Sequence, residues 1–229
     1  MADGSHTLRT SQSIDMAVSQ RAMLSHAFYR AWTEGKLSLD TLQEYAKQYF
    51  HHVEQFPRVV SAVHSQCPDA QGRKMLAENL AEEEGLNGPG KQDHATLWMH
   101  FAEGLGATRS DVRGVALNPE TTALIDTFRR LARTSYAAGL GALYAYESQL
   151  PDVASTKIAG LTGYGVSDEQ TIRFFRVHEE ADREHAAVCR ALIDALPADQ
   201  QRQAQQAAEE LADALLGFLS GVERTTGLH

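Results

Sequence analysis

Apolar side chains recur at helical spacing along nearly the whole chain, and this is the feature that most limits its fold. No alternating run bounded by turn residues indicates a β-strand. The sequence therefore predicts an all-α protein. We expect one bundle of about seven or eight helices, because 229 residues with 43% hydrophobic content can bury a sizeable single core. We assign residues 13–229 to this domain and residues 1–12 to a flexible leader.

Capping and helix-breaking residues predict where the helices begin and end. Ser38 is a candidate N-cap after a stop near Gly35, and Pro57 is expected to kink the helix that follows. The glycines and proline within 86–93 predict a loop. The expected helices are Ser13–Trp32, one from Ser38 through Val60, Asp69–Glu84, one starting near His94, a long one from Asn118 to Gln149, its continuation beyond Pro151 through Lys157, one opened by a capping box at Ser167 and Gln170, and Asp199–Leu219.

Charge and cysteine content exclude several classes of function. A formal net charge of -9 disfavours binding to nucleic acid or to an anionic membrane surface. Cys67 and Cys189 are far apart and lack zinc-type spacing, so neither a disulfide framework nor a structural zinc site is indicated. No stretch approaches the ~18 apolar residues of a membrane span, and no signal peptide is apparent. We therefore expect a cytoplasmic protein with neither nucleic acid nor membrane as a partner.

The strongest local motif is the segment from His178 to His185. His178, Asp182 and His185 occupy positions i, i+4 and i+7, which lie within roughly 60° of one another on a helix. Imidazole and carboxylate ligands suit iron, manganese or zinc. Charged neighbours surround the three residues, so this motif alone fits a solvated helix face equally well.

Carboxylates elsewhere favour the metal interpretation. Glu147 is flanked by apolar and aromatic residues, and a buried carboxylate needs a compensating cation. Three consecutive glutamates, residues 82–84, end one expected helix, and His94 follows across the glycine-rich loop. Helical bundles build two-metal, oxygen-activating sites from such carboxylates and histidines. Taken singly, the glutamates fit a solvated helix end and His94 fits a surface residue.

The sequence resembles the heme-oxygenase-like dinuclear metal oxidases. Within them it is similar to the branch named for the chlamydial protein associating with death domains, which is related to pyrroloquinoline-quinone synthase C. The resemblance covers about His26 to Leu219. It is carried by the segments HAFYRAW, YAKQYFHHVEQFPR, NLAEEEG, HATLW, ALYAYESQLP and HEEADREH. By motif, it implies two metal ions, Fe/Fe or Fe/Mn, with the ligands Glu83, His94, Glu147, His178, Asp182 and His185.

The resemblance further implies synthesis of para-aminobenzoate, a folate precursor, from the protein's own side chains. Tyr29 matches the tyrosine that provides the ring, Lys157 the lysine implicated as amino donor, and Tyr45 a second nearby tyrosine. Molecular oxygen and an external reductant would be the co-substrates. Phe50 stands where a relative has tyrosine. Without the resemblance, Tyr29 would be read as a core residue and Lys157 as a solvated charge.

Two details of spacing bear on these assignments. On a straight helix Lys157 would lie about 15 Å from Glu147, so a break near Pro151 is required. The loop between Glu83 and His94 is longer than in the close relatives. Alignment of the neighbouring residues with the family pattern implies that Glu83, and neither of its two glutamate neighbours, is the ligand. Consecutive helical residues differ by about 100° in direction, so only one of the three glutamates can face the site.

Two other functions remain open on the sequence alone. The same ligands could oxidise an external small molecule, which would not need Tyr29 or Lys157. A protein-binding module is the second alternative, although nothing in the sequence encodes death-domain binding. The sequence does not determine which two metals are bound or whether the chain forms a homodimer.

Overall fold

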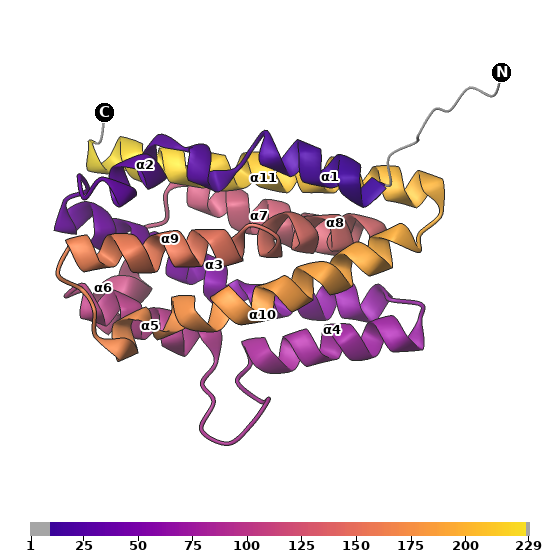
Figure 1. The fold of residues 1–229 in the computed structure, drawn as a ribbon, viewed down its shortest axis with the longest axis horizontal. Coiled ribbons are helices and arrows are strands. Elements are labelled where there is room, and N and C mark those ends of the chain that lie inside the picture. The colour runs from indigo at the N-terminus through magenta and orange to yellow at the C-terminus, as the bar shows by residue number, and fades with distance from the viewer. Residues whose placement is uncertain (1–9, 228–229) are drawn as a thin grey trace.

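The computed structural model describes residues 10–227, and within them the protein is all-α, as predicted (Figure 1). The described part has eleven α-helices, one 3-10 turn and no strand. No helix of this part is long and apolar enough to cross a membrane. In chain order the elements are α1 (Thr10–Ser19), η1 (Met23–Ser25), α2 (Ala27–Thr33), α3 (Leu39–Gln66), α4 (Ala70–Glu83), α5 (His94–Gly104), α6 (Arg109–Gly114), α7 (Pro119–Thr134), α8 (Tyr136–Glu147), α9 (Leu150–Gly163), α10 (Glu169–Asp194) and α11 (Ala198–Thr226).

Several predicted helix ends are confirmed by their capping hydrogen bonds. The Ser38 side chain accepts a hydrogen bond from the Thr41 amide at the start of α3. Gly85 ends α4 with φ of +67°, a left-handed conformation in which glycine carries no Cβ penalty. The loop that follows projects from the bundle before α5 begins at His94 (Figure 1). α3 continues through Pro57 without interruption.

The expected helix Ser13–Trp32 is wrong, because the chain forms three shorter pieces. Ala22 and His26 have extended backbone angles on either side of η1. The His26 side chain then accepts a hydrogen bond from the Phe28 amide and caps α2. The expected leader, residues 1–12, lies mostly outside the described residues, although α1 already begins at Thr10.

The long helix expected from Asn118 to Gln149 is also interrupted. Ser135 has an extended backbone and its side chain accepts a hydrogen bond from the Ala138 amide, so α8 starts with its own N-cap. The capping box expected at Ser167 is replaced by Asp168, whose carboxylate accepts from the Thr171 amide. Helix α6 was not predicted from the sequence, and α11 is longer than the expected Asp199–Leu219.

Helix α8 forms the centre of the bundle. All of its residues after Tyr136 are buried, and it packs against α7, α10 and α11. Gly141 allows the closest approach, because a Cβ there would lie 2.0 Å from the Ala204 carbonyl oxygen of α11. This central position places Glu147, the last residue of α8, deep inside the protein.

Candidate metal centre

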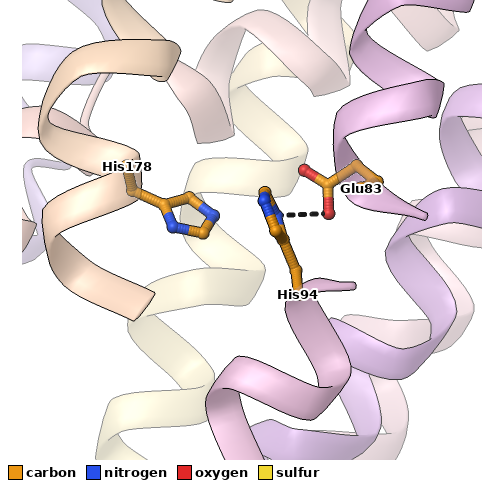
Figure 2. Close-up of side chains that lie close together, drawn as sticks. All are labelled: Glu83, His94 and His178. Carbon is orange, nitrogen blue, oxygen red and sulfur yellow. Dashed lines mark ion pairs between the residues drawn. The ribbon is translucent and has the colours of Figure 1, made fainter. Parts of the chain in front are cut away.

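Three of the predicted ligands converge on one point inside the bundle. Figure 2 shows Glu83 from the end of α4, His94 from the start of α5 and His178 from α10 pointing toward one another. Each offers a ligand atom within 4.8 Å of the other two, and all three are buried. Glu83 Oε2 lies 2.7 Å from His94 Nδ1. The two imidazole rings are 4.4 Å apart between centroids.

Burial sets the protonation of this group. It raises the pKa of Glu83 to about 8 and lowers the pKa values of His94 and His178 to about 4. Both imidazoles are therefore neutral at neutral pH, the form that binds metals. His178 Nδ1 lies 2.6 Å from the carbonyl oxygen of Phe174, which fixes the ring and leaves Nε2 as its ligand atom.

The other three predicted ligands lie beside this group without converging as tightly. Glu147 accepts hydrogen bonds at both oxygens, from Asn79 Nδ2 at 2.7 Å and from Cys189 Sγ at 3.4 Å. His185 Nδ1 is 3.4 Å from Asp182 Oδ1. Among the described residues, Asp182 Oδ2 and His185 Nδ1 are buried without a hydrogen-bond partner.

The second trio places one imidazole, that of His185, beside the two buried carboxyls of Glu147 and Asp182. Burial raises the pKa values of Glu147 and Asp182. Burial also opposes a charge on His185, but the carboxylates around it outweigh that effect and raise its pKa to about 9. One imidazole does not neutralise two ionised carboxylates, so a bound cation would favour their charged form.

The donor set fits transition-metal ions that bind oxygen and nitrogen ligands. It combines carboxylates and neutral imidazoles, and several of these buried atoms have no hydrogen-bond partner within the described part. Burial keeps the Cys189 thiol protonated by raising its pKa, so it acts as a hydrogen-bond donor to Glu147. The residues present therefore suit iron or manganese.

A buried amine forms the second feature of the interior. Lys157 is only 2% exposed, and its Nζ donates a hydrogen bond to Tyr45 Oη at 2.5 Å. Burial places the pKa of Lys157 well below its ordinary value, because it disfavours the charged ammonium form. The nitrogen faces five aromatic rings at 5.0 to 5.7 Å from their centroids, those of Tyr29, Tyr45, Tyr49, Trp98 and Phe175.

A line of tyrosines connects this amine to the metal centre. Tyr29 Oη is 3.4 Å from Tyr45 Oη, and the Tyr45 ring stacks on Tyr49 with 5.6 Å between centroids. Tyr49 Oη donates to Tyr146 Oη at 2.9 Å, and Tyr146 directly precedes Glu147. Tyr29 is therefore linked toward the centre through other rings.

The break between α8 and α9 places Lys157 as the sequence required. α8 ends at Glu147 and α9 begins at Leu150, with Pro151 in its first turn. Lys157 is thereby buried on a separate helix. The break precedes Pro151, because proline favours the first turn of a helix.

Several residues that contact the predicted ligands were not predicted from the sequence. Asn79 and Cys189 hold the two oxygens of Glu147. Glu82, which we had set aside in favour of Glu83, places Oε2 3.1 Å from His185 Nε2. The available signal was the NLAEEEG segment, in which Asn79 lies one helical turn before Glu83 and so shares its face.

Known proteins resemble this chain over nearly its full length. It is 40% identical to the 4-aminobenzoate synthase of Chlamydia trachomatis over 208 residues, 90% of this chain and 88% of that protein. It is 38% identical to the 4-aminobenzoate synthase of Nitrosomonas europaea, over 92% of this chain and 89% of that protein. Pyrroloquinoline-quinone synthases match more distantly, at 25–27% identity.

The fold is also similar to that of a solved protein structure. A domain from Shewanella denitrificans, described as having a heme oxygenase-like fold, superimposes with a TM-score of 0.74 at 18% identity, over 95% of this chain and 92% of that one. The sequence model of a family described as iron-containing redox enzymes matches residues 43–218, which include all six predicted ligands. The chain belongs to this heme-oxygenase-like family of iron-containing redox enzymes.

Proposed function

We propose that the chain makes 4-aminobenzoate from the ring of Tyr29, with the nitrogen of Lys157 as the amino group, at a dinuclear metal site. The names of the relatives from Chlamydia and Nitrosomonas support the product, because the alignments span at least nine-tenths of this chain. The reaction uses molecular oxygen and an external reductant. A cytoplasmic location is part of the proposal, and the free cysteines Cys67 and Cys189 agree with a reducing compartment.

The buried amine of Lys157, hydrogen-bonded to Tyr45, is the observation that carries this proposal. 4-Aminobenzoate bears its nitrogen where tyrosine bears its hydroxyl, so an amino donor must reach the hydroxyl end of the ring. Lys157 Nζ contacts Tyr45 Oη, which in turn lies 3.4 Å from Tyr29 Oη. Burial favours the uncharged amine, whose lone pair would form the new carbon–nitrogen bond as the ring loses its hydroxyl. Release of the product also requires oxidative cleavage of the Cε–Nζ bond of Lys157 and of the Cα–Cβ bond of Tyr29, with molecular oxygen as the oxidant.

The six ligands would hold two metals, iron with iron or iron with manganese: Glu83, His94, Glu147, His178, Asp182 and His185. When bound, these ions would supply the oxidising power by activating oxygen. The line of rings from Tyr146 through Tyr49 and Tyr45 connects this site with Tyr29. The closely packed aromatic residues around Lys157 exclude water from the reacting groups.

Consumption of Tyr29 limits each chain to a single molecule of product, and this can be tested directly. The parent should rescue growth of a para-aminobenzoate auxotroph, whereas Tyr29→Phe should not, because its ring carries no hydroxyl for the amine to replace. Tyr136→Phe, which changes a half-buried tyrosine that contacts Cys67, is the control and should rescue like the parent.

Mass spectrometry of the purified protein gives an independent readout. After exposure to iron, reductant and oxygen, the parent should lose mass at Tyr29, and Lys157→Met should not. Rescue by Tyr29→Phe as strong as that by the parent would remove Tyr29 as the ring source. An external small molecule would then become the leading substrate.

A further inference from the structure

Glu82 lies at the point where the candidate metal centre comes nearest to solvent. Its side chain is 31% exposed, and its partner His185 is 11% exposed, whereas the side chains of Glu83, His94 and Asp182 are only 3–4% exposed. The pair thus forms the outer edge of the centre. Glu82 is at the end of α4, one residue before Glu83.

A cavity of about 310 Å³ leads to this edge. Glu82 and His94 both line it, together with residues of the loop after α4 and of α10. Its walls carry the acidic groups Glu82 and Glu184 and the basic groups Lys91 and Arg173. Two acidic and two basic groups therefore line the cavity. Glu82 is the lining acidic group whose contact with a predicted ligand, His185, is shown.

The distance between Glu82 and His185 matches that between two ligands of one ion. Bonds of 2.0–2.2 Å at right angles place neighbouring ligand atoms about 3 Å apart. Glu82 Oε2 and His185 Nε2 are 3.1 Å apart, and Glu83 Oε2 and His94 Nδ1 are 2.7 Å apart. His185 and His94 thus each have a carboxylate oxygen at the spacing of two adjacent metal ligands.

We propose that Glu82 is a further metal ligand, which shares with His185 the ion nearest the cavity and receives that ion from solvent. This rests on the proposed dinuclear site. Nδ1 of His185 faces Asp182, so its Nε2 is the ring atom directed toward Glu82. The carboxylate of Glu82 is the most exposed of those in contact with a predicted ligand. An ion that binds it from solvent can exchange its water ligands for protein ligands without opening of the bundle.

Titration of the metal-free protein with Mn²⁺ alone tests the proposal, with the electron paramagnetic resonance signal of free Mn²⁺ as the readout. The parent should bind two ions. Glu82→Gln should bind the first ion like the parent. It should bind the second ion at least about tenfold more weakly and more slowly, since a carboxylate at a cleft raises association rates by that order.

Two matched variants separate ligation from loss of charge. Glu84→Gln removes the neighbouring charge, and Glu84 lines other cavities. Glu184→Gln removes a charge from the same cavity. Both should bind Mn²⁺ within about twofold of the parent. Glu82→Asp keeps the charge and should retain part of the second-site affinity.

Some outcomes overturn only the role of Glu82. Parent-like binding by Glu82→Gln would show that Glu82 is not a ligand, and tighter binding would show that it competes with the metal for His185. A parent that binds fewer than two ions would instead remove the dinuclear site on which the proposal rests. Far-UV circular dichroism of Glu82→Gln confirms that the variant is folded.

Discussion

At the scale of single residues, His52 shows how strongly burial acts on this interior. Its ring stacks on Phe128 with 5.7 Å between centroids and meets Tyr146 edge-on at 5.0 Å. Its Nε2 has no hydrogen-bond partner among the described residues. Burial lowers the pKa of His52 to about 3. The folded protein therefore holds this imidazole neutral, whereas an unfolded chain would protonate it near its ordinary pKa of 6.5.

We expect His52 to make the protein acid-sensitive. The stability that the neutral His52 ring contributes is complete above about pH 6.5. It is lost as the pH falls toward 3, because only the unfolded chain then takes up the proton. Between pH 6.5 and about 5 this loss amounts to about 1.5 kcal/mol. Urea unfolding of metal-free His52→Phe should show a correspondingly smaller loss than the parent. An unchanged loss in His52→Phe would contradict the assignment, and His64→Gln on the same helix is the control.

The sequence identified ligand residue types but not the contacts around them. Helical spacing alone put His178, Asp182 and His185 on one face, and in the structure Asp182 and His185 lie 3.4 Å apart. The contacts of Glu82 and Cys189 could not be predicted, because they depend on how α4, α8 and α10 meet in space. Side chains with no local pattern acquire their partners only through tertiary packing.

At the scale of helices, the close contact between α8 and α11 positions Glu147. We expect Gly141→Ala to destabilise the protein by about 1–3 kcal/mol, because the added Cβ would meet the backbone carbonyl of Ala204 at 2.0 Å. Moving α8 outward should also lower metal content. Gly217→Ala is the matched control, since no atom lies within 4 Å of its Cβ position. It should raise stability by about 0.5–1 kcal/mol through helix propensity.

Chemical unfolding of both variants, with metal analysis of each, checks this prediction. A Gly141→Ala protein as stable as the parent would show that the two helices separate easily.

Helix starts were easier to predict than interruptions within apolar runs. Ser38 precedes a new periodic segment, so its capping role was visible in the sequence. Ser135 also caps a helix, but no glycine or proline lies within three residues of it on either side. Helical periodicity therefore merged α7 and α8 into one expected helix. Ser135 is a favourable N-cap, but no adjacent helix-breaking residue indicates that the preceding helix ends there.

At the scale of the whole molecule, the six predicted ligands tie together four helices that are distant in the sequence: α4, α5, α8 and α10. An ion that binds only the folded arrangement stabilises it by about 2.7 kcal/mol at a hundredfold excess over its Kd. For a chain of this size, we expect Mn²⁺, or Fe²⁺ without oxygen, to raise Tm by roughly 5–10 °C.

His178→Ala should lose most of this shift, because it removes a ligand at the point where three of the residues converge. Calorimetry of the parent and the variant measures the difference. Mg²⁺, which prefers oxygen ligands, is the control ion and should give a smaller shift. Equal shifts with Mn²⁺ in the parent and in His178→Ala would place the bound ion elsewhere.

The position of Tyr29 has a consequence for the lifetime of the protein. Its ring is almost fully buried and packs against Phe28 and Trp32. A chain that had given up this ring to its product would keep a cavity in its core, and removal of a buried aromatic side chain typically costs about 3–5 kcal/mol. Losses of that size expose a protein to proteolysis in the cell. Spent molecules would thus be degraded ahead of fresh ones, and supply of the product would follow the rate at which new chains are synthesised.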